Sequence, residues 1–124
     1  MSSPIRANEV DESAAIKAST DWLSIVDKGQ YGQSWDKSAQ FLKTAVKRKD
    51  FESKLKASRG QFGQLVSRTI KSKHFMTAMP GAPDGKYVVI QYTTSFSSKK
   101  SAIETVTPMQ EKDGQWKVSG YFIN

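Results

Sequence analysis

The chain has 124 residues, with 19 Lys and Arg against 12 Asp and Glu, a formal net charge of +7 and no cysteine. This length suits one domain that buries about two-thirds of its unfolded surface, so a core can form without a metal or disulfide. The absence of cysteine excludes disulfides, thiolate metal sites and thiol catalysis, and no apolar run approaches the roughly 18 residues of a membrane-spanning helix.

Three helices are predicted before the first strand. The first covers about residues 9–28, where apolar residues recur at steps of three and four and Gly29 follows as a helix stop. A second helical stretch covers residues 31–46 with the same periodicity. A third begins at Asp50, a good N-cap residue, and ends at the glycines that start with Gly60. These helices are expected to form a compact group that needs a further surface to cover.

Four strands are predicted after the helices, because the hydrophobic period changes to two from Leu65 onwards. Without a bulge, the even-numbered residues from Val66 to Met76 share one face of the first strand. The next two strands are expected at residues 86–96, after a turn rich in Pro and Gly, and at about 101–111. The last strand follows the tight turn at Asp113-Gly114. Its alternation places Trp116, Val118, Gly120 and Phe122 on one face and Lys117, Ser119 and Tyr121 on the other.

Short connections between these strands require antiparallel neighbours. Helices followed by such a sheet predict an α+β fold, in which N-terminal helices pack on a four-stranded antiparallel sheet. Residues 1–8 are expected to be a flexible segment and residues 9–124 a single α+β domain.

Two charged residues lie in phase with the apolar face of the predicted sheet. Arg68 is in phase with Val66 and Ile70, and Glu104 is in phase with its own apolar neighbours. A buried charge is costly unless it is paired, so we expect these two residues to meet, or Arg59 at the end of the third helix to join one of them. They would form either the polar floor of a ligand cavity or a structural salt bridge, whereas a register shift of one residue would move both to solvent.

The leading hypothesis is a non-catalytic binding or accessory module that holds a small, anionic or amphipathic ligand between the helices and the concave sheet. Its predicted ligand-binding residues are Arg68, Glu104, Arg59, Trp35, Tyr92 and Trp116. No catalytic residue, cofactor or metal ion is predicted, because the chain has no phosphate-binding glycine loop, no metal-ligand spacing and no paired carboxylates on the strands.

Three alternatives remain open. A protein-interaction or homodimerisation domain would use the outward sheet face, with Tyr121, Ser119, Lys117 and Thr105 on it. An enzyme would use Glu104 or the single histidine, His74, as its acid or base. Nucleic-acid binding through the basic residues at 43–59 is disfavoured, because lysine predominates there, as on an ordinary solvated helix face.

Short motifs spread along residues 14–123 resemble a known family. They are Trp22-Leu23, residues 27–31, Ser34-Trp35, Arg59, Gly63, Ser67-Arg68, residues 80–85, Phe96, Glu104-Thr105 and residues 113–121. Together they resemble DUF4019, a bacterial family of unknown function. The resemblance implies an exported, periplasmic protein, although this chain shows no export signal and a cytoplasmic location stays open. It also implies a curved sheet similar to the NTF2-like, cystatin-like cone, a fold that hosts small-molecule pockets, dimers and a few enzymes. The acid–base pairs of those enzymes have no clear counterpart here.

Overall fold

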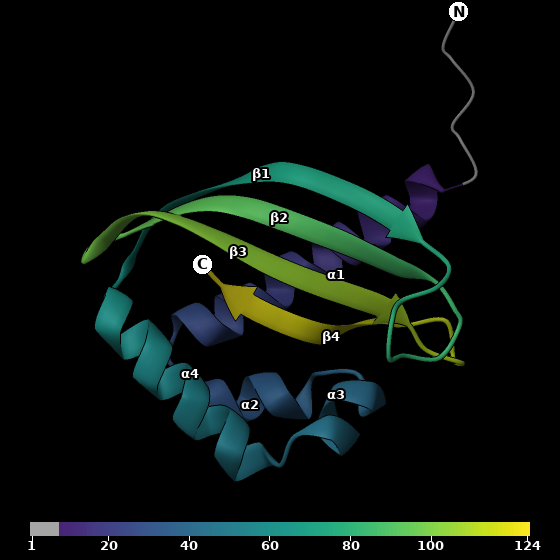
Figure 1. Ribbon diagram of the computed structural model, residues 1–124, viewed down its shortest axis with the longest axis horizontal. Helices are drawn as coiled ribbons and strands as arrows, with labels where there is room; N and C mark the ends of the chain where they lie inside the picture. Colours follow the sequence, from purple (N-terminus) through teal and green to yellow (C-terminus); the bar gives the residue numbers. More distant parts are fainter. Residues whose placement is uncertain (1–7) are drawn as a thin grey trace, which may run out of the picture.

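The computed structural model describes residues 8–124. Four helices precede four strands: α1 Glu9–Asp27, α2 Tyr31–Asp36, α3 Gln40–Ala45, α4 Arg48–Phe62, β1 Leu65–Met76, β2 Tyr87–Phe96, β3 Lys99–Gln110 and β4 Trp116–Ile123. This order confirms the predicted α+β class (Figure 1). The segment expected to be flexible, residues 1–8, lies outside the described residues except for its last residue. No helix within residues 8–124 is long and apolar enough to cross a membrane.

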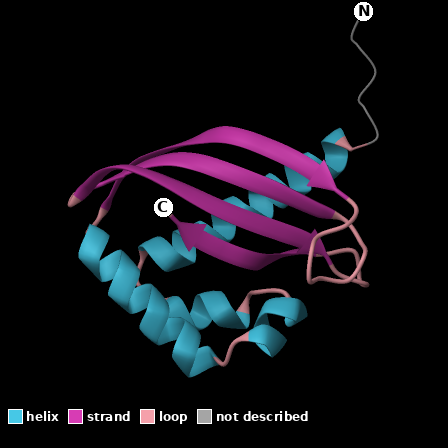
Figure 2. Cartoon of the chain, in the orientation of Figure 1, coloured by secondary structure: helices cyan, strands magenta, loops and turns pink. Residues whose placement is uncertain are grey.

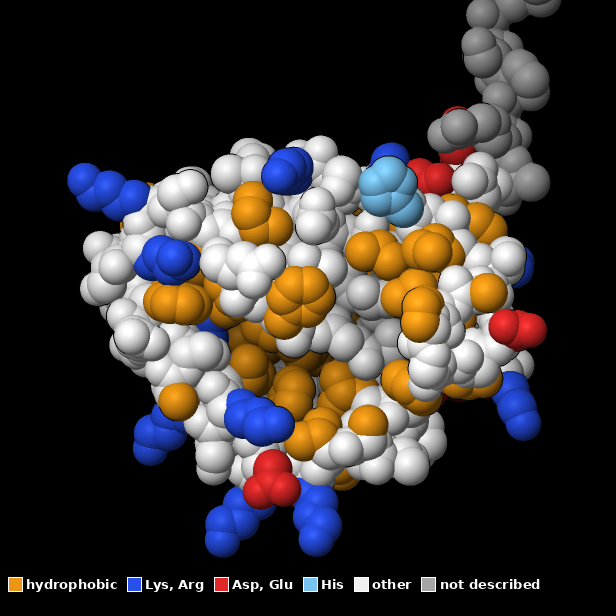
Figure 3. All heavy atoms as spheres, in the orientation of Figure 1, with side chains coloured by type: hydrophobic (Ala, Val, Ile, Leu, Met, Phe, Trp, Pro, Cys, Tyr) orange, Lys and Arg blue, Asp and Glu red, His pale blue; other side chains and the backbone are white. Residues whose placement is uncertain are grey.

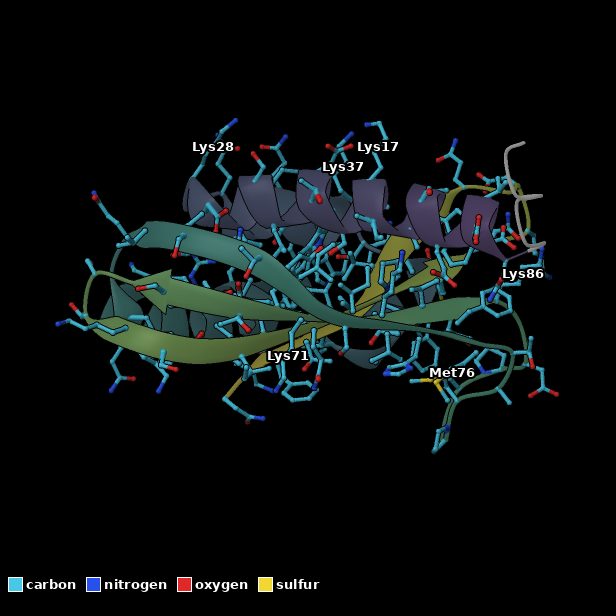
Figure 4. The ribbon with its side chains drawn as sticks, turned by 90° about the horizontal axis from the view of Figure 1, so that it is seen from above. Lys17, Lys28, Lys37, Lys71, Met76 and Lys86 are labelled. Carbon is cyan, nitrogen blue, oxygen red and sulfur yellow. The ribbon has the colours of Figure 1, made fainter. Side chains whose placement is uncertain are left out.

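The strands form one antiparallel sheet in the order β1-β2-β3-β4, as their short connections require. The sheet is bent, and α2, α3 and α4 lie beyond the β4 edge (Figure 2). Seen from above, α1 runs along one face of the sheet, whereas Lys71 of β1 points away on the opposite side (Figure 4). The sheet therefore has one face covered by α1 and one open face.

The hydrophobic core lies between α1 and the covered face of the sheet. The apolar stripe of α1 buries Trp22, Leu23 and Val26, and alternate residues of β2, including Val88 and Ile90, meet it. Each of these five side chains is at most 3% exposed. Burying a side chain of this kind stabilises the fold by about 1.5–3 kcal/mol, so this contact holds the sheet against its longest helix.

The helical stretch predicted at residues 31–46 is divided into α2 and α3. α2 ends at Asp36, and just beyond it the Ser38 hydroxyl donates to the Ser34 carbonyl oxygen (2.7 Å) and accepts from the Trp22 indole nitrogen (3.0 Å). Ala39 then adopts an extended conformation, and its N–H donates to the carbonyl oxygen of Val118 on β4 (2.8 Å). This hydrogen bond joins residues far apart in sequence, so helical periodicity could not indicate the break.

The alternation predicted for β1 is interrupted by bulges between Leu65 and Ser67 and between Ile70 and Ser72. After the second bulge the faces exchange, and the ammonium group of Lys73 points towards α1, 3.4 Å from the carboxylate of Glu12. The even-numbered residues from 66 to 76 were expected to share one face only in the absence of a bulge, and with these two bulges they do not share it along the whole strand. Bulges are common on edge strands such as β1, where they end or redirect pairing.

A third bulge, in β4, places side chains on other faces than simple alternation predicts. Thr107 pairs with Gly120 whereas Pro108 pairs with Val118, so Ser119 is an extra residue. Because of this insertion, Val118 and Tyr121 lie on the same, covered face, although simple alternation had placed them on opposite faces.

Candidate functional site

Four charged residues meet between α1, α4 and the covered face of the sheet. The guanidinium of Arg68 on β1 donates to both carboxylate oxygens of Glu104 on β3. Its Nε lies 2.6 Å from Oε1, and its Nη2 lies 3.2 Å from Oε2. The same guanidinium donates to both carboxylate oxygens of Asp27 at the end of α1, at 2.8 and 3.0 Å. Arg59 of α4 donates to Asp27 from Nη2 at 2.8 Å. The structure thus confirms that Arg68 and Glu104 face inward and meet, and it joins Arg59 to them through Asp27.

Two hydroxyl groups complete the environment of Glu104, which has no exposed surface. Thr94 of β2 donates from Oγ1 to Oε1 at 2.6 Å, and the hydroxyl of Tyr121 on β4 donates to Oε2. Two positive and two negative side chains therefore face each other, and the Glu104 carboxylate receives donors on both oxygens. Such pairing is what allows a charge to be buried. We call Asp27, Arg59, Arg68, Glu104, Thr94 and Tyr121 the ionic cluster.

The environment also sets the pKa values of three members of the cluster. Burial raises the pKa of Asp27, but hydrogen bonds and charges from Arg68 and Arg59 outweigh it and hold this pKa below its usual value. Burial lowers the pKa of Arg68, and its bonds to Asp27 and Glu104 more than compensate, so the pKa is raised. For Tyr121, burial and then the charge of Glu104 raise the phenol pKa. At neutral pH, Asp27 is ionised and the other two are protonated, so none of the three is poised to exchange a proton.

Arg59 is the member of the cluster with unused donors. It is 4% exposed, and within the described residues its Nε and Nη1 atoms have no hydrogen-bond partner. Its guanidinium carbon lies 4.7 Å from the ring centroid of Phe96. This cation–π contact offsets part of the cost of burying the two unused groups.

An apolar groove lies beside the cluster, between α3 and α4 on one side and β4 on the other. Its volume is about 470 Å³. Its apolar lining comprises Leu42, Ala45, Val46, Phe51, Leu55, Phe62, Phe122 and Ile123, and Lys54, Ser58, Ser119, Gly120 and Tyr121 complete it. A space-filling view shows a hollow lined by hydrophobic side chains below the sheet (Figure 3). Tyr121 belongs to both the groove and the ionic cluster, since it lines the groove and its hydroxyl donates to Glu104.

One end of the groove is basic. A second, more open hollow shares Ala45, Val46 and Lys54 with the groove and adds Thr44, Lys47, Asp50 and Ser53. The apolar lining therefore leads into a region that contains two lysines and one aspartate. A bound molecule that extends from the groove would meet positive charge there.

None of the three predicted aromatic site residues lines this groove. The Trp35 indole donates to the Val46 carbonyl oxygen at 2.8 Å, and the Tyr92 hydroxyl shares a 2.8 Å hydrogen bond with buried Ser19. Trp116 borders a separate hollow beside α1. The structure does not bring these three residues together around one cavity, and their contact with a ligand stays a prediction, as does that of Arg59, Arg68 and Glu104.

Among the residues proposed for the alternatives, His74 is exposed and pairs with Val89. Thr105 and Lys117 lie on the side of the sheet opposite α1, but Thr105 is buried there, and Tyr121 lies on the covered side. No group of three or more His, Cys, Asp or Glu side chains in the part of the chain that is described could hold a metal ion.

Sequence reasoning missed Asp27 and the apolar groove. A signal for Asp27 existed, because two inward arginines and one inward glutamate leave one positive charge that needs a partner. No comparable signal marked the groove, whose lining comes from residues 42–62 and 119–123.

Comparison with known proteins places the chain in a family. No curated protein and no solved structure matches it, so the predicted likeness to the NTF2-like cone has no support from solved structures. The model of DUF4019, described as a protein of unknown function, matches residues 18–121. This match covers the second half of α1, the other helices, β1 to β3 and β4 as far as Tyr121, and the chain therefore belongs to the DUF4019 family.

Proposed function

We propose that the protein is a non-catalytic binding protein, and that its binding site is the groove between α4 and β4. The observation that carries this proposal is the apolar hollow of about 470 Å³ on the surface of a chain of 124 residues. Pockets for ligands typically have volumes of about 300–1,000 Å³ and mostly apolar walls with a few polar groups. The groove has this size and this kind of lining.

The charges around the groove support an anionic group on the ligand. Lys54 stands where the groove meets the second hollow, and Lys47 lies within that hollow. The whole chain carries a net charge of +7, which attracts anions over a longer range. An amphipathic molecule would place its apolar part against Phe51 and Leu55 and its anionic group near Lys54.

The ionic cluster supports a role without catalysis. The shifted pKa values of Asp27, Arg68 and Tyr121 keep each group in one protonation state around neutral pH. Arg68 and Glu104 are also occupied by each other and by neighbouring side chains. We therefore assign the ionic cluster a structural role: through Tyr121, it supports the wall of the groove.

Binding of dodecanoate, a single-chain carboxylate, tests the proposal by titration calorimetry. Replacing Lys54→Glu should weaken binding about tenfold, because an attraction worth up to about 1 kcal/mol becomes a repulsion. Lys56→Glu is the matched control, since this exposed lysine lies on the same helix outside the groove. Equal weakening of dodecanoate binding by both variants would contradict the proposal.

A further inference from the structure

The groove follows the edge of β4, not one face of it. It contacts five consecutive residues, Ser119–Ile123. Successive side chains of a strand point to opposite faces, so a hollow resting on one face would contact alternate residues. Contact with all five residues places the groove along the strand's side, where no other strand of residues 8–124 pairs with β4.

The pairing of β3 with β4 shows which backbone groups of β4 point away from β3 and into the groove. Ile103 and Asn124 exchange two backbone hydrogen bonds, with N···O distances of 3.1 and 2.9 Å. In an antiparallel pair such exchanges recur at every second residue, and the residues between them direct their N–H and C=O groups away from the partner strand. Tyr121 and Ile123 are these intervening residues, so their backbone groups face the groove.

One extended residue of this chain already bonds to the same edge. Ala39 has φ −61° and ψ 150°, and its N–H donates to the Val118 carbonyl oxygen at 2.8 Å. After Ala39 the chain enters α3 at Gln40, and on β4 the groove begins at Ser119, the residue that follows Val118. The groove thus continues the line along which one backbone hydrogen bond is made.

We propose that the groove binds an extended peptide segment, which adds to the sheet as a fifth strand beside β4. This inference rests on the proposed function and names its ligand. Backbone groups of the peptide would pair with Tyr121 and Ile123, and alternate side chains would lie against the apolar wall formed by Leu55 and Phe62. An acidic side chain at one end would meet Lys54.

A purely aliphatic ligand fits the groove less well than a peptide. An alkyl chain would cover the apolar wall and expel water, but it offers no partner to the backbone groups of Tyr121 and Ile123. A buried polar group that loses its water without a new partner costs about 1–3 kcal/mol. A peptide satisfies both sides of the groove, because it carries apolar side chains and a backbone with donors and acceptors.

The experiment uses the full chain and a mixture of capped hexapeptides with Asp at the first position and Val, Ile, Leu or Phe at alternate positions. Peptides retained by the protein are identified by mass spectrometry. The strongest is then compared with two N-methylated forms, one methylated at the amides of its odd-numbered residues and the other at those of its even-numbered residues. Only one of the two sets of peptide amides faces β4. Methylation of that set should weaken binding by about tenfold or more, whereas the peptide methylated at the other set should bind like the parent peptide.

Nuclear magnetic resonance supplies a second readout. The amide signals of Tyr121 and Ile123 should shift on peptide binding, and Ser58→Trp, which fills the groove, should abolish binding, whereas Ala57→Trp on the exposed side of α4 should not. If dodecanoate binds but no peptide is retained, or if both N-methylated forms bind equally, strand addition is wrong while the proposed function stands. If neither dodecanoate nor any peptide binds, both proposals fail.

Discussion

Glu104 is fully buried, yet each of its carboxylate oxygens accepts hydrogen bonds, from Arg68 and from a hydroxyl of Thr94 or Tyr121. Its direction was predictable because strand alternation places it in phase with apolar neighbours. Asp27 was not predictable in this way. It is the last residue of α1, where helical periodicity no longer distinguishes an inward from an outward position.

The lowered pKa of Asp27 leads to a prediction of pH dependence. Its folded-state pKa lies below the unfolded value of about 3.9. The stability that ionised Asp27 contributes is therefore complete above about pH 4 and is lost as the pH falls through the folded-state pKa. Asp27→Asn should be less stable than the original protein at pH 7, and this difference should shrink below about pH 4. Urea unfolding at several pH values measures it, and a difference that grows on acidification would contradict the assignment.

At the scale of elements, the order of helices and strands was predictable, because hydrophobic period and turn residues are local signals. The bulges in β1 and β4 were not. Each inserts one residue, carries no distinct propensity and reverses the face of every later side chain. Tyr121 shows the consequence: expected on the open face, it instead joins the groove to the ionic cluster.

The junction between α4 and β1 gives a prediction at this scale. Gly63 has φ +82°, and a Cβ atom added there would clash with the Ser97 hydroxyl oxygen, which accepts a hydrogen bond from the Gln64 N–H. Gly63→Ala should therefore destabilise the protein by at least about 1–3 kcal/mol, the cost of strained backbone alone. Gly60→Ala is the control, since this helical glycine has open space around it and should gain up to about 1 kcal/mol. Thermal unfolding of the two variants tests this prediction, and equal changes in their stability would contradict it.

At the scale of the whole molecule, the ionic cluster connects nearly every element. The four strands contribute Arg68, Thr94, Glu104 and Tyr121, and α1 and α4 contribute Asp27 and Arg59. The groove depends equally on tertiary structure, because its two walls are brought together only when α3 and α4 lie beside the β4 edge (Figure 1). Sequence patterns describe each wall as part of a helix or strand, and they contain no information on the space between them.

A cluster that links so many elements should make Glu104 important for global stability. Removing one partner of a buried ion pair leaves an uncompensated charge and costs about 3–5 kcal/mol, so Glu104→Gln should lower the free energy of unfolding by this amount. Lys17→Ala is the control, because its ion pair with Asp21 is exposed and should contribute at most about 1 kcal/mol.

Urea unfolding of Glu104→Gln, Arg68→Met and the double variant identifies the origin of this cost. If the penalty arises from the unpaired charge of Arg68, adding Arg68→Met to Glu104→Gln should recover part of the lost stability, because one fewer buried charge then needs a partner. Asp27 stays bonded to Arg59 in the double variant. Effects that simply add would mean that Arg68 and Glu104 stabilise the fold independently, and the cluster would then not act as one unit.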